Sequence, residues 1–251
     1  CYGGEGMKVN IVNNYYKPGP ATPEKGPVSY RIAAIGVRTT RYCYKEDGTP
    51  NIWQPMEHVW GRLYVDGNVV EGHPDVTRDN WTKGIYGQIN NAACDHTFTE
   101  EVKKEIRLST PLETGTVTTH SAEEAYRLVL EDAGCSKWRD VIDERIVQET
   151  LKGTATYIGS VTPEAEKVPG LIDLPADVKP EGAAAAWPEL SDGGVTADDL
   201  RDTDGDGMLD IWEIAHGLNP QDASDGTSTT LSEEGYTNLE VYLNSMVEKQ
   251  F

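Results

Sequence analysis

Two stretches of the chain share one pattern: Val-Asn-Ile-Val-Asn-Asn-Tyr-Tyr at residues 9–16 and Leu-Tyr-Val-Asp-Gly-Asn-Val-Val at residues 63–70. In each stretch a short run of apolar, strand-forming residues is interrupted by Asn or Gly, residue types that favour turns. The coils of a parallel β-helix have this form, because each coil turns at Asn or Gly and stacks its side chains on those of its neighbours. Two such strands would also suit a β-sandwich. We expect a mainly β protein in which residues 1–118 form terminal coils of a solenoid, with the earlier coils missing from this chain.

Helical patterns replace the strand patterns in residues 119–160. Ser121 and Glu124 are three residues apart and form a capping box, and Gly134 is a natural stop for the helix that follows. A second helix is expected from about residue 139 to residue 152. We therefore expect a helical segment after the strands.

The remaining sequence divides into a linker and a terminal module. Residues 161–196 are dominated by Pro, Gly, Ala and acidic residues without any period, which is typical of an extended arm or linker. In residues 197–251 we expect a short helix over residues 210–216 and a final helix that begins at the capping box Thr237-Asn238-Leu239-Glu240. Apolar side chains recur on one face of that final helix, so we expect it to dock on an apolar surface. They are Leu239, Tyr242, Leu243, Met246 and Val247.

The stretch Asp202-Thr203-Asp204-Gly205-Asp206-Gly207-Met208-Leu209-Asp210-Ile211-Trp212-Glu213 matches the twelve-residue calcium loop of an EF-hand at every informative position. Aspartates stand at the first, third, fifth and ninth positions, a glutamate stands at the twelfth, and Gly207 takes the sixth, where the backbone turns sharply. Met208 offers its backbone carbonyl at the seventh position, and Asp210 offers a direct or water-bridged contact. The expected Ca²⁺ ligands are Asp202, Asp204, Asp206, Met208, Asp210 and Glu213.

This loop has no clear second copy in the chain. Residues 222–226, Asp-Ala-Ser-Asp-Gly, lack the alternation of acidic residues and have no acid at the twelfth position. Calcium sensors normally pair two loops, so the single loop favours a structural clip that orders the C-terminal tail.

Composition limits the classes of partner. The chain has 251 residues and a formal net charge of −20, which disfavours nucleic acid because phosphate binding depends on Lys and Arg. An acidic polysaccharide is also repelled on average, unless local cations or bridging Ca²⁺ overcome the field. The sequence contains no apolar run near the roughly 20 residues that span a bilayer.

The start of the chain and its cysteines leave several possibilities open. Cys1 is not preceded by an initiator Met or a signal peptide, and we expect a chain that begins inside a domain through processing or truncation rather than a lipidated cysteine. Cysteines at positions 1, 43, 94 and 135 allow three disulfide pairings or none, and their spacing matches no zinc pattern.

Several strings, taken together, resemble the closing part of secreted pectate lyases of polysaccharide lyase family one, of the type found in Bacteroides-like gut bacteria. The strings occur in the order of the family and cover almost the whole chain. They are Cys-Tyr-Gly-Gly-Glu-Gly (1–6), Val-Asn-Asn-Tyr-Tyr-Lys-Pro-Gly-Pro-Ala-Thr (12–22), Tyr-Val-Asp-Gly-Asn-Val-Val-Glu-Gly (64–72), Thr-His-Ser-Ala-Glu-Glu-Ala-Tyr (119–126), Pro-Gly-Leu-Ile-Asp (169–173), Asp-Thr-Asp-Gly-Asp-Gly-Met (202–208) and Gly-Tyr-Thr-Asn-Leu-Glu-Val-Tyr-Leu-Asn (235–244).

The resemblance implies a right-handed parallel β-helix and cleavage of polygalacturonate, the de-esterified form of pectin, by β-elimination. In such enzymes an arginine removes the proton at C5, while Ca²⁺ and a lysine neutralise the uronate carboxylate. The family's strings Arg-x-Pro-x-x-Arg and Trp-Ile-Asp-His are both absent from the 251 residues. We therefore expect the C-terminal part of a secreted, periplasmic or cell-surface bacterial lyase whose catalytic residues are unknown. Its base is expected outside this sequence, on an N-terminal portion that is on another chain or was not included.

A second reading is a non-enzymatic, calcium-stabilised carbohydrate-binding or surface assembly module, since no catalytic constellation can be defended in this sequence. Arg31 and Arg38 are candidates for substrate contact, although arginines on solenoid surfaces are more often solvated. Tyr15 and Tyr16, or Trp53 and Trp60, are candidates for stacking on sugar rings, although core or rim packing is the commoner role for such residues.

Overall fold

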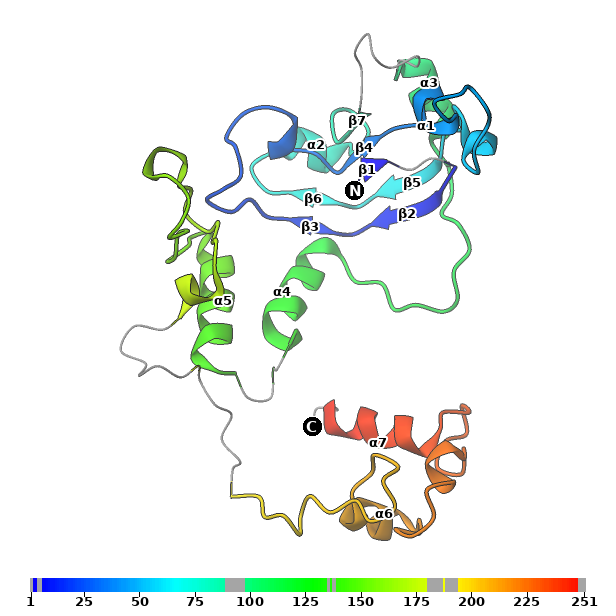
Figure 1. Ribbon diagram of the computed structural model, residues 1–251, viewed down its shortest axis with the longest axis vertical. Helices are drawn as coiled ribbons and strands as arrows, with labels where there is room; N and C mark the ends of the chain where they lie inside the picture. Colours follow the sequence, from blue (N-terminus) through cyan, green and yellow to red (C-terminus); the bar gives the residue numbers. More distant parts are fainter. Residues whose placement is uncertain are drawn as a thin grey trace. The chain divides into compact units, whose positions relative to one another are not determined.

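The structure is a computed structural model that describes residues 2–3, 6–88, 98–134, 136, 139–179, 187 and 194–247, and every structural statement below concerns these residues. The chain divides into two compact units, Cys1–Gly182 and Ala183–Phe251. Each unit is described by itself (Figure 1).

The first unit begins with short strands that pair in parallel. β1, β4 and β7 form one sheet in that order, β2 pairs with β5, and β3 pairs with β6. Figure 1 shows β2 beside β5 and β3 beside β6, with the β1–β4–β7 set next to them. The strands are β1 (Tyr2–Gly3), β2 (Lys8–Val12), β3 (Tyr15–Tyr16), β4 (Ala33–Ile35), β5 (Arg62–Asp66), β6 (Val69–Val70) and β7 (Ile85–Gly87).

The two stretches that share a sequence pattern lie against each other. In register, Val9 pairs with Leu63 between β2 and β5, and Tyr15 pairs with Val69 between β3 and β6. The turn between β2 and β3 contains Asn13 at a φ of 55°. Successive coils of a parallel β-helix make such pairings. The assignment to a right-handed β-helix remains a prediction.

The interior between these strands is apolar, with stacked asparagines at one turn. Asn68 is fully buried; its side-chain amide donates to the Ile11 carbonyl at 2.7 Å and to Asn80 Oδ1 at 3.0 Å. Asn14 donates to Asn68 Oδ1 at 2.8 Å. These amides replace the backbone hydrogen bonds that a sharp turn forfeits. The apolar core consists of Ile11, Ile32, Ala33, Ile35, Leu63, Val65, Val70, Val76, Trp81, Ile85 and Ile106.

Short helices fill the connections between the strands. They are α1 (Thr40–Cys43), α2 (Pro74–Arg78) and α3 (Glu100–Ile106). Thr99 caps α3 by accepting a hydrogen bond from the Val102 amide, and Ile106 at the end of α3 is fully buried in the core. Arg107 then forms a parallel bridge with Leu63. The chain after α3 thereby extends the β2–β5 pair.

The two helices predicted after residue 119 are confirmed. α4 spans Ala122–Asp132 and α5 spans Val141–Lys152. The Ser121 side chain accepts from the Glu124 amide at 3.2 Å, as its capping box predicts. Tyr126 of α4 stacks on Tyr15 of β3 with ring centroids 4.6 Å apart, which attaches α4 to the strands. Asp140 caps α5.

The linker predicted over residues 161–196 is folded in its first half. Residues 164–166 and 175–178 form 3-10 turns. Asp173 accepts from the Val161 and Thr162 amides at 2.8 and 2.7 Å, and Asp177 accepts from the Leu174 amide at 2.9 Å. Here side-chain carboxylates bind backbone amides in place of the regular hydrogen bonds of a helix or strand. The segment therefore folds without a periodic pattern of apolar residues that the sequence would reveal. Most of residues 180–196 lie outside the described part of the chain.

The second unit contains the two helices expected there. α6 spans Asp210–His216 and α7 spans Asn238–Val247. The capping box of α7 is confirmed, because Glu240 accepts from the Thr237 amide at 2.7 Å and Thr237 Oγ1 accepts from the Glu240 amide at 3.2 Å. Tyr242 is buried, but further along the same face Val247 is 70% exposed. The docking of this face on an apolar partner stays a prediction.

Two further predictions meet the described residues only in part. Cys43 is fully buried and its thiol contacts the Trp53 carbonyl at 3.5 Å. The other three cysteines, at positions 1, 94 and 135, lie outside the described residues. None of the described helices has both the length and the apolar character that crossing a bilayer requires.

Candidate calcium site

The calcium-loop sequence forms a tight loop that leads into α6. Its aspartates hold the backbone: Asp202 accepts from the Gly205 amide at 2.8 Å and from the Gly207 amide at 3.0 Å, and Asp206 accepts from the Met208 amide at 2.9 Å. Gly207 has a φ of 98°, a conformation that glycine adopts without strain. The glycine expected at the sixth position therefore stands at the sharp turn that the motif requires.

Several carboxylate oxygens of this region are buried without a hydrogen-bond partner among the described residues. They come from the loop, from α6 and from a later turn. They are Asp204 Oδ2, Asp206 Oδ2, both oxygens of Glu213, and Asp225 Oδ1. A buried, unpaired carboxylate is costly unless it is neutralised or binds a cation.

These oxygens belong to two overlapping acidic groups. Asp202, Asp204 and Asp206 each offer an oxygen within 4.8 Å of the others, and so do Asp206, Glu213 and Asp225. Because Asp206 is common to both groups, the carboxylates surround one region. Ca²⁺ takes about six to eight oxygen ligands at roughly 2.3–2.6 Å, and carboxylates are its preferred protein ligands. The residues present therefore fit a calcium ion.

The electrostatics of the acidic cluster agree with this fit. Burial, together with the neighbouring carboxylates of Asp204, Asp206 and Asp225, raises the pKa of Glu213 to about 7. The pKa of Asp206 is also raised, first by burial and then by Asp204, Asp202 and Asp225. Crowded anions favour protonation, and a divalent cation at the same place would remove that penalty.

Asp225 is a candidate ligand that the loop motif does not predict. It lies outside the twelve-residue loop, in the 3-10 turn Asp225–Thr227, and its second oxygen accepts from the Asn219 amide at 2.9 Å. A Cβ added at the buried Gly226 would collide with Asp206 Oδ2, so a glycine permits this close approach. The pair Asp225-Gly226 was therefore the sequence signal that could have identified this candidate ligand. Residues 222–226 nevertheless lack the pattern of a second calcium loop.

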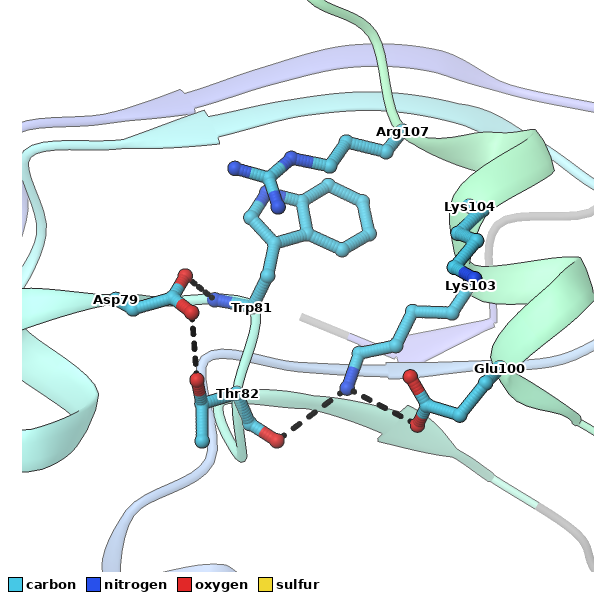
Figure 2. Close-up of a pocket in the computed structure, with 7 residues that line it drawn as sticks. All are labelled: Asp79, Trp81, Thr82, Glu100, Lys103, Lys104 and Arg107. Carbon is cyan, nitrogen blue, oxygen red and sulfur yellow. Dashed lines mark hydrogen bonds and ion pairs between the residues drawn. The ribbon is translucent and has the colours of Figure 1, made fainter.

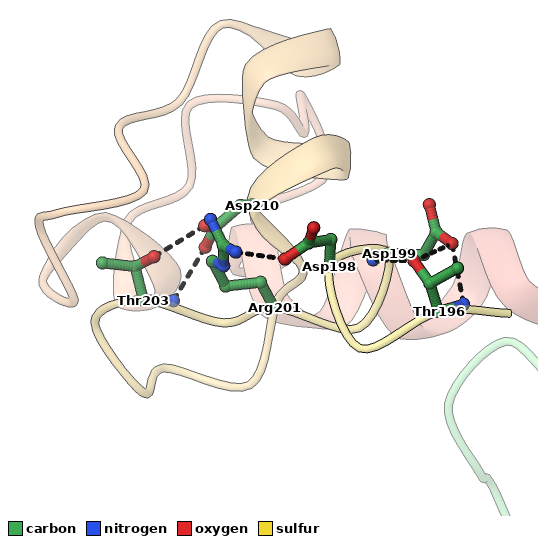
Figure 3. A network of polar contacts seen from close by, with 6 residues as sticks. All are labelled: Thr196, Asp198, Asp199, Arg201, Thr203 and Asp210. Atoms are coloured by element: carbon green, nitrogen blue, oxygen red, sulfur yellow. Dashed lines mark hydrogen bonds and ion pairs between the residues drawn. The ribbon is translucent and has the colours of Figure 1, made fainter.

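Asp210, expected as a ligand at the ninth position, lies in neither acidic group. Figure 3 shows its carboxylate directed at Thr203, whose amide and hydroxyl donate to it at 2.7 and 2.6 Å. Its backbone amide donates to the Arg201 carbonyl at 2.8 Å, and Arg201 pairs with Asp198. Asp210 thus closes the loop by hydrogen bonds, and its contact with calcium remains a prediction.

Met208, expected to offer its carbonyl at the seventh position, is fully buried. Its amide donates to Asp206, which places it at the centre of the loop. The ligand role of its carbonyl remains a prediction.

A buried asparagine connects the Asp225 turn to α7. Asn238, fully buried, donates through its side chain to the Asp225 carbonyl at 2.9 Å and accepts from the Leu231 amide at 3.0 Å. Trp212 of α6 packs edge-to-face on Tyr242 of α7 at 5.0 Å. The acidic cluster is therefore linked by hydrogen bonds and aromatic packing to both helices of the unit.

The substrate-contact candidates of the first unit occupy ordinary structural positions. Arg31 donates to the Tyr86 hydroxyl at 3.2 Å, and the Arg38 guanidinium lies over the Trp53 ring at 4.0 Å. Trp60 packs edge-to-face on Phe98 at 5.7 Å. These contacts bring no base, nucleophile or paired carboxylates together among the named residues.

Comparison with known proteins gives a partial match. No family model matches the chain. The chain is 31% identical over 133 residues to a protein named "Probable pectate lyase C" from Aspergillus fumigatus, in each of two strains, CBS 144.89 and Af293. The matched segment covers 53% of this chain and 26% of each relative, so the chain aligns with about a quarter of their length. This similarity supports a distant relationship to pectate lyases.

Proposed function

We propose that the chain is part of a pectate lyase-like polysaccharide lyase that acts on polygalacturonate. In this proposal it supplies closing coils of a right-handed parallel β-helix and a C-terminal unit held together by Ca²⁺. The observation that carries the proposal is the similarity to "Probable pectate lyase C". The parallel pairing of β2 with β5 and of β3 with β6 is consistent with it.

The calcium site has a structural role in this proposal. Asp204, Asp206, Glu213 and Asp225 would hold the ion, and the ion would supply the positive charge that their buried oxygens lack. Because Asn238 joins the Asp225 turn to α7, filling the site would order the unit from the loop to the last helix. The site lies on a unit of its own, and we do not assign it to the chemistry of the lyase.

The catalytic base is proposed to lie outside this chain, because the Arg-x-Pro-x-x-Arg and Trp-Ile-Asp-His strings of the family are absent from it. A separate N-terminal part of the same enzyme would carry the base. We further propose a secreted, periplasmic or cell-surface location, where the enzyme would encounter polygalacturonate.

The test combines intact mass measurement of native material with a lyase assay. We expect a copurifying chain that carries the missing strings, and together the two chains should release unsaturated uronate from polygalacturonate, detected by its ultraviolet absorbance. Unsaturated product from this chain alone would show that the base lies within it. An assembled pair that leaves polygalacturonate intact would overturn the lyase proposal.

A second candidate is a non-enzymatic, calcium-stabilised carbohydrate-binding or assembly module. It is favoured by the built acidic cluster together with the missing catalytic strings. A chain that purifies alone, binds Ca²⁺ and yields no product with any N-terminal part would support it.

A further inference from the structure

A pocket of about 350 Å³ lies between the loop after α2 and helix α3 of the first unit. Figure 2 shows the seven side chains that line it, with Arg107 against the ring of Trp81 and Lys103 reaching across to the loop. A pocket of this size is large enough for one sugar residue. The lining residues are Asp79, Trp81, Thr82, Glu100, Lys103, Lys104 and Arg107.

The walls of the pocket are fixed by contacts with the core. Trp81 is 4% exposed, and its indole N–H donates to the Val65 carbonyl at 3.1 Å. Asp79 accepts from the Trp81 amide at 3.1 Å and from the Thr82 hydroxyl at 2.5 Å. Lys103 of α3 donates to the Thr82 carbonyl at 3.3 Å, which ties the helix to the loop. The pocket is therefore built by packed elements.

The side chains that line the pocket are net positive, whereas the chain as a whole is net negative. Three cationic and two acidic side chains line the pocket, whereas the whole chain has a formal net charge of −20. Lys103 pairs with Glu100 at 3.6 Å. In the part of the chain that the structure describes, no carboxylate forms an ion pair with Lys104 or Arg107. Both side chains are exposed to solvent.

Arg107 is positioned to recognise a planar anion. Its guanidinium lies 5.1 Å from the centre of the Trp81 ring, and this cation–π contact holds the group while leaving N–H donors at its edge. A guanidinium edge matches a carboxylate through two parallel hydrogen bonds, a geometry that the ammonium group of a lysine does not provide.

Asp79 adds a hydrogen-bond acceptor to the donors supplied by Arg107. The Thr82 hydroxyl, the Trp81 amide and the nearby charges of Arg107 and Lys103 hold the pKa of Asp79 below its usual range, so it stays ionised. An ionised carboxylate accepts hydrogen bonds from hydroxyl groups. The pocket thus combines donors for a carboxylate with an acceptor for hydroxyls.

We propose that this pocket binds a uronic acid residue, with its carboxylate on Arg107 and Lys104 and its hydroxyls on Asp79. The requirement for a carboxylate beside hydroxyls follows from the pocket alone, whereas the choice of galacturonate rests on the proposed function. Binding here requires no turnover, so it is measured independently of lyase activity.

The test is calorimetric titration of the full chain in EDTA at low salt, with digalacturonate, galactobiose and inorganic phosphate as separate probes. We expect digalacturonate to bind at least about tenfold more tightly than either other probe, which corresponds to about 1.4 kcal/mol. Arg107→Gln and Lys104→Gln should each weaken it by about tenfold, and Arg107→Lys by less than Arg107→Gln. Lys45→Gln, which removes an exposed charge elsewhere on the same unit, should leave the affinity unchanged.

The outcomes separate the alternatives. Equal binding of galactobiose would remove the role of the carboxylate, and equal binding of phosphate would reduce the pocket to a general anion site. An equal loss of digalacturonate affinity in Lys45→Gln would show that the net charge of the chain, and not the pocket, causes the weaker binding. Circular dichroism of each variant checks folding, and Lys104→Gln decides the matter if the Arg107 variants unfold, because Lys104 is exposed. A chain that binds digalacturonate here but lacks lyase activity with any N-terminal part would retain this proposal while the proposed function fails.

Discussion

Replacing Asp225 by asparagine perturbs the calcium site at the ligand that lies outside the loop. The substitution keeps the size of the side chain and an oxygen that can accept from the Asn219 amide, but it removes one negative charge from the group formed with Asp206 and Glu213. In calcium the variant should be less stable than the wild type. In EDTA it should be more stable, because one of several crowded, unpaired carboxylates is gone.

The size of the effect follows from the interactions that change. A charge-assisted contact contributes roughly 1.5–3 kcal/mol, so calcium affinity should fall by about 10-fold to 100-fold. For a domain of roughly 60–100 residues each kcal/mol shifts Tm by about 4–8 °C. The Tm of the second unit in saturating calcium should therefore fall by about 6 °C or more. In EDTA the Tm of the variant should instead lie above that of the wild type.

Differential scanning calorimetry of the full chain in calcium and in EDTA measures both shifts, and hydrogen exchange assigns the transition to residues 194–247. Asp222→Asn is the matched control, because Asp222 is exposed just before the Asp225–Thr227 turn and its carboxylate accepts from the Ser224 amide and hydroxyl. Equal effects of the two substitutions, or an Asp225→Asn variant that loses stability in both conditions, would refute the assignment of Asp225 as a ligand.

Three further predictions concern Glu213, Asn238 and Asp177. Without calcium, the pKa of Glu213 is raised from its ordinary value of 4.5 to about 7, so the second unit should lose stability as the pH rises from about 4.5 through 7. Glu213→Gln should flatten this dependence in thermal melts in EDTA. Asn238→Ala leaves the Leu231 amide unpaired and removes one of two donors to the Asp225 carbonyl, which keeps the Ser228 amide. The substitution should lower the free energy of unfolding by about 1–3 kcal/mol in urea titrations, and an unchanged free energy would contradict the linking role of this residue. Asp177 has a pKa lowered from 3.8 to about 2, so its hydrogen bonds stabilise the 157–179 loop above about pH 4 and are lost towards pH 2, and Asp177→Asn should abolish that pH dependence of amide exchange at Leu174.

Elements defined by local chemistry were predictable from the sequence. The capping boxes at Ser121 and Thr237 identify the starts of two helices, because the cap and its partner are three residues apart. The calcium-loop motif is recognisable for the same reason, since its acidic residues and its glycine occupy fixed positions within twelve residues.

Features that depend on distant residues were less accessible. Asp225 reaches the cluster only through the fold of the second unit, and its sequence neighbourhood lacks a loop pattern. The folded part of the predicted linker depends on Asp173 and Asp177, which accept hydrogen bonds from backbone amides. These contacts leave no periodic pattern in the sequence. The pocket beside Trp81 joins residues of two elements, so neither element predicts it alone.

Calcium titration of the purified chain by calorimetry tests the central claim most directly. The carboxylates of Asp204, Asp206, Glu213 and Asp225 predict one Ca²⁺ bound per chain, proton release on binding near neutral pH, and weaker binding in Asp225→Asn but not in Asp222→Asn. A chain that takes up no Ca²⁺, or that binds it equally well after Glu213→Gln and Asp225→Asn, would contradict the site.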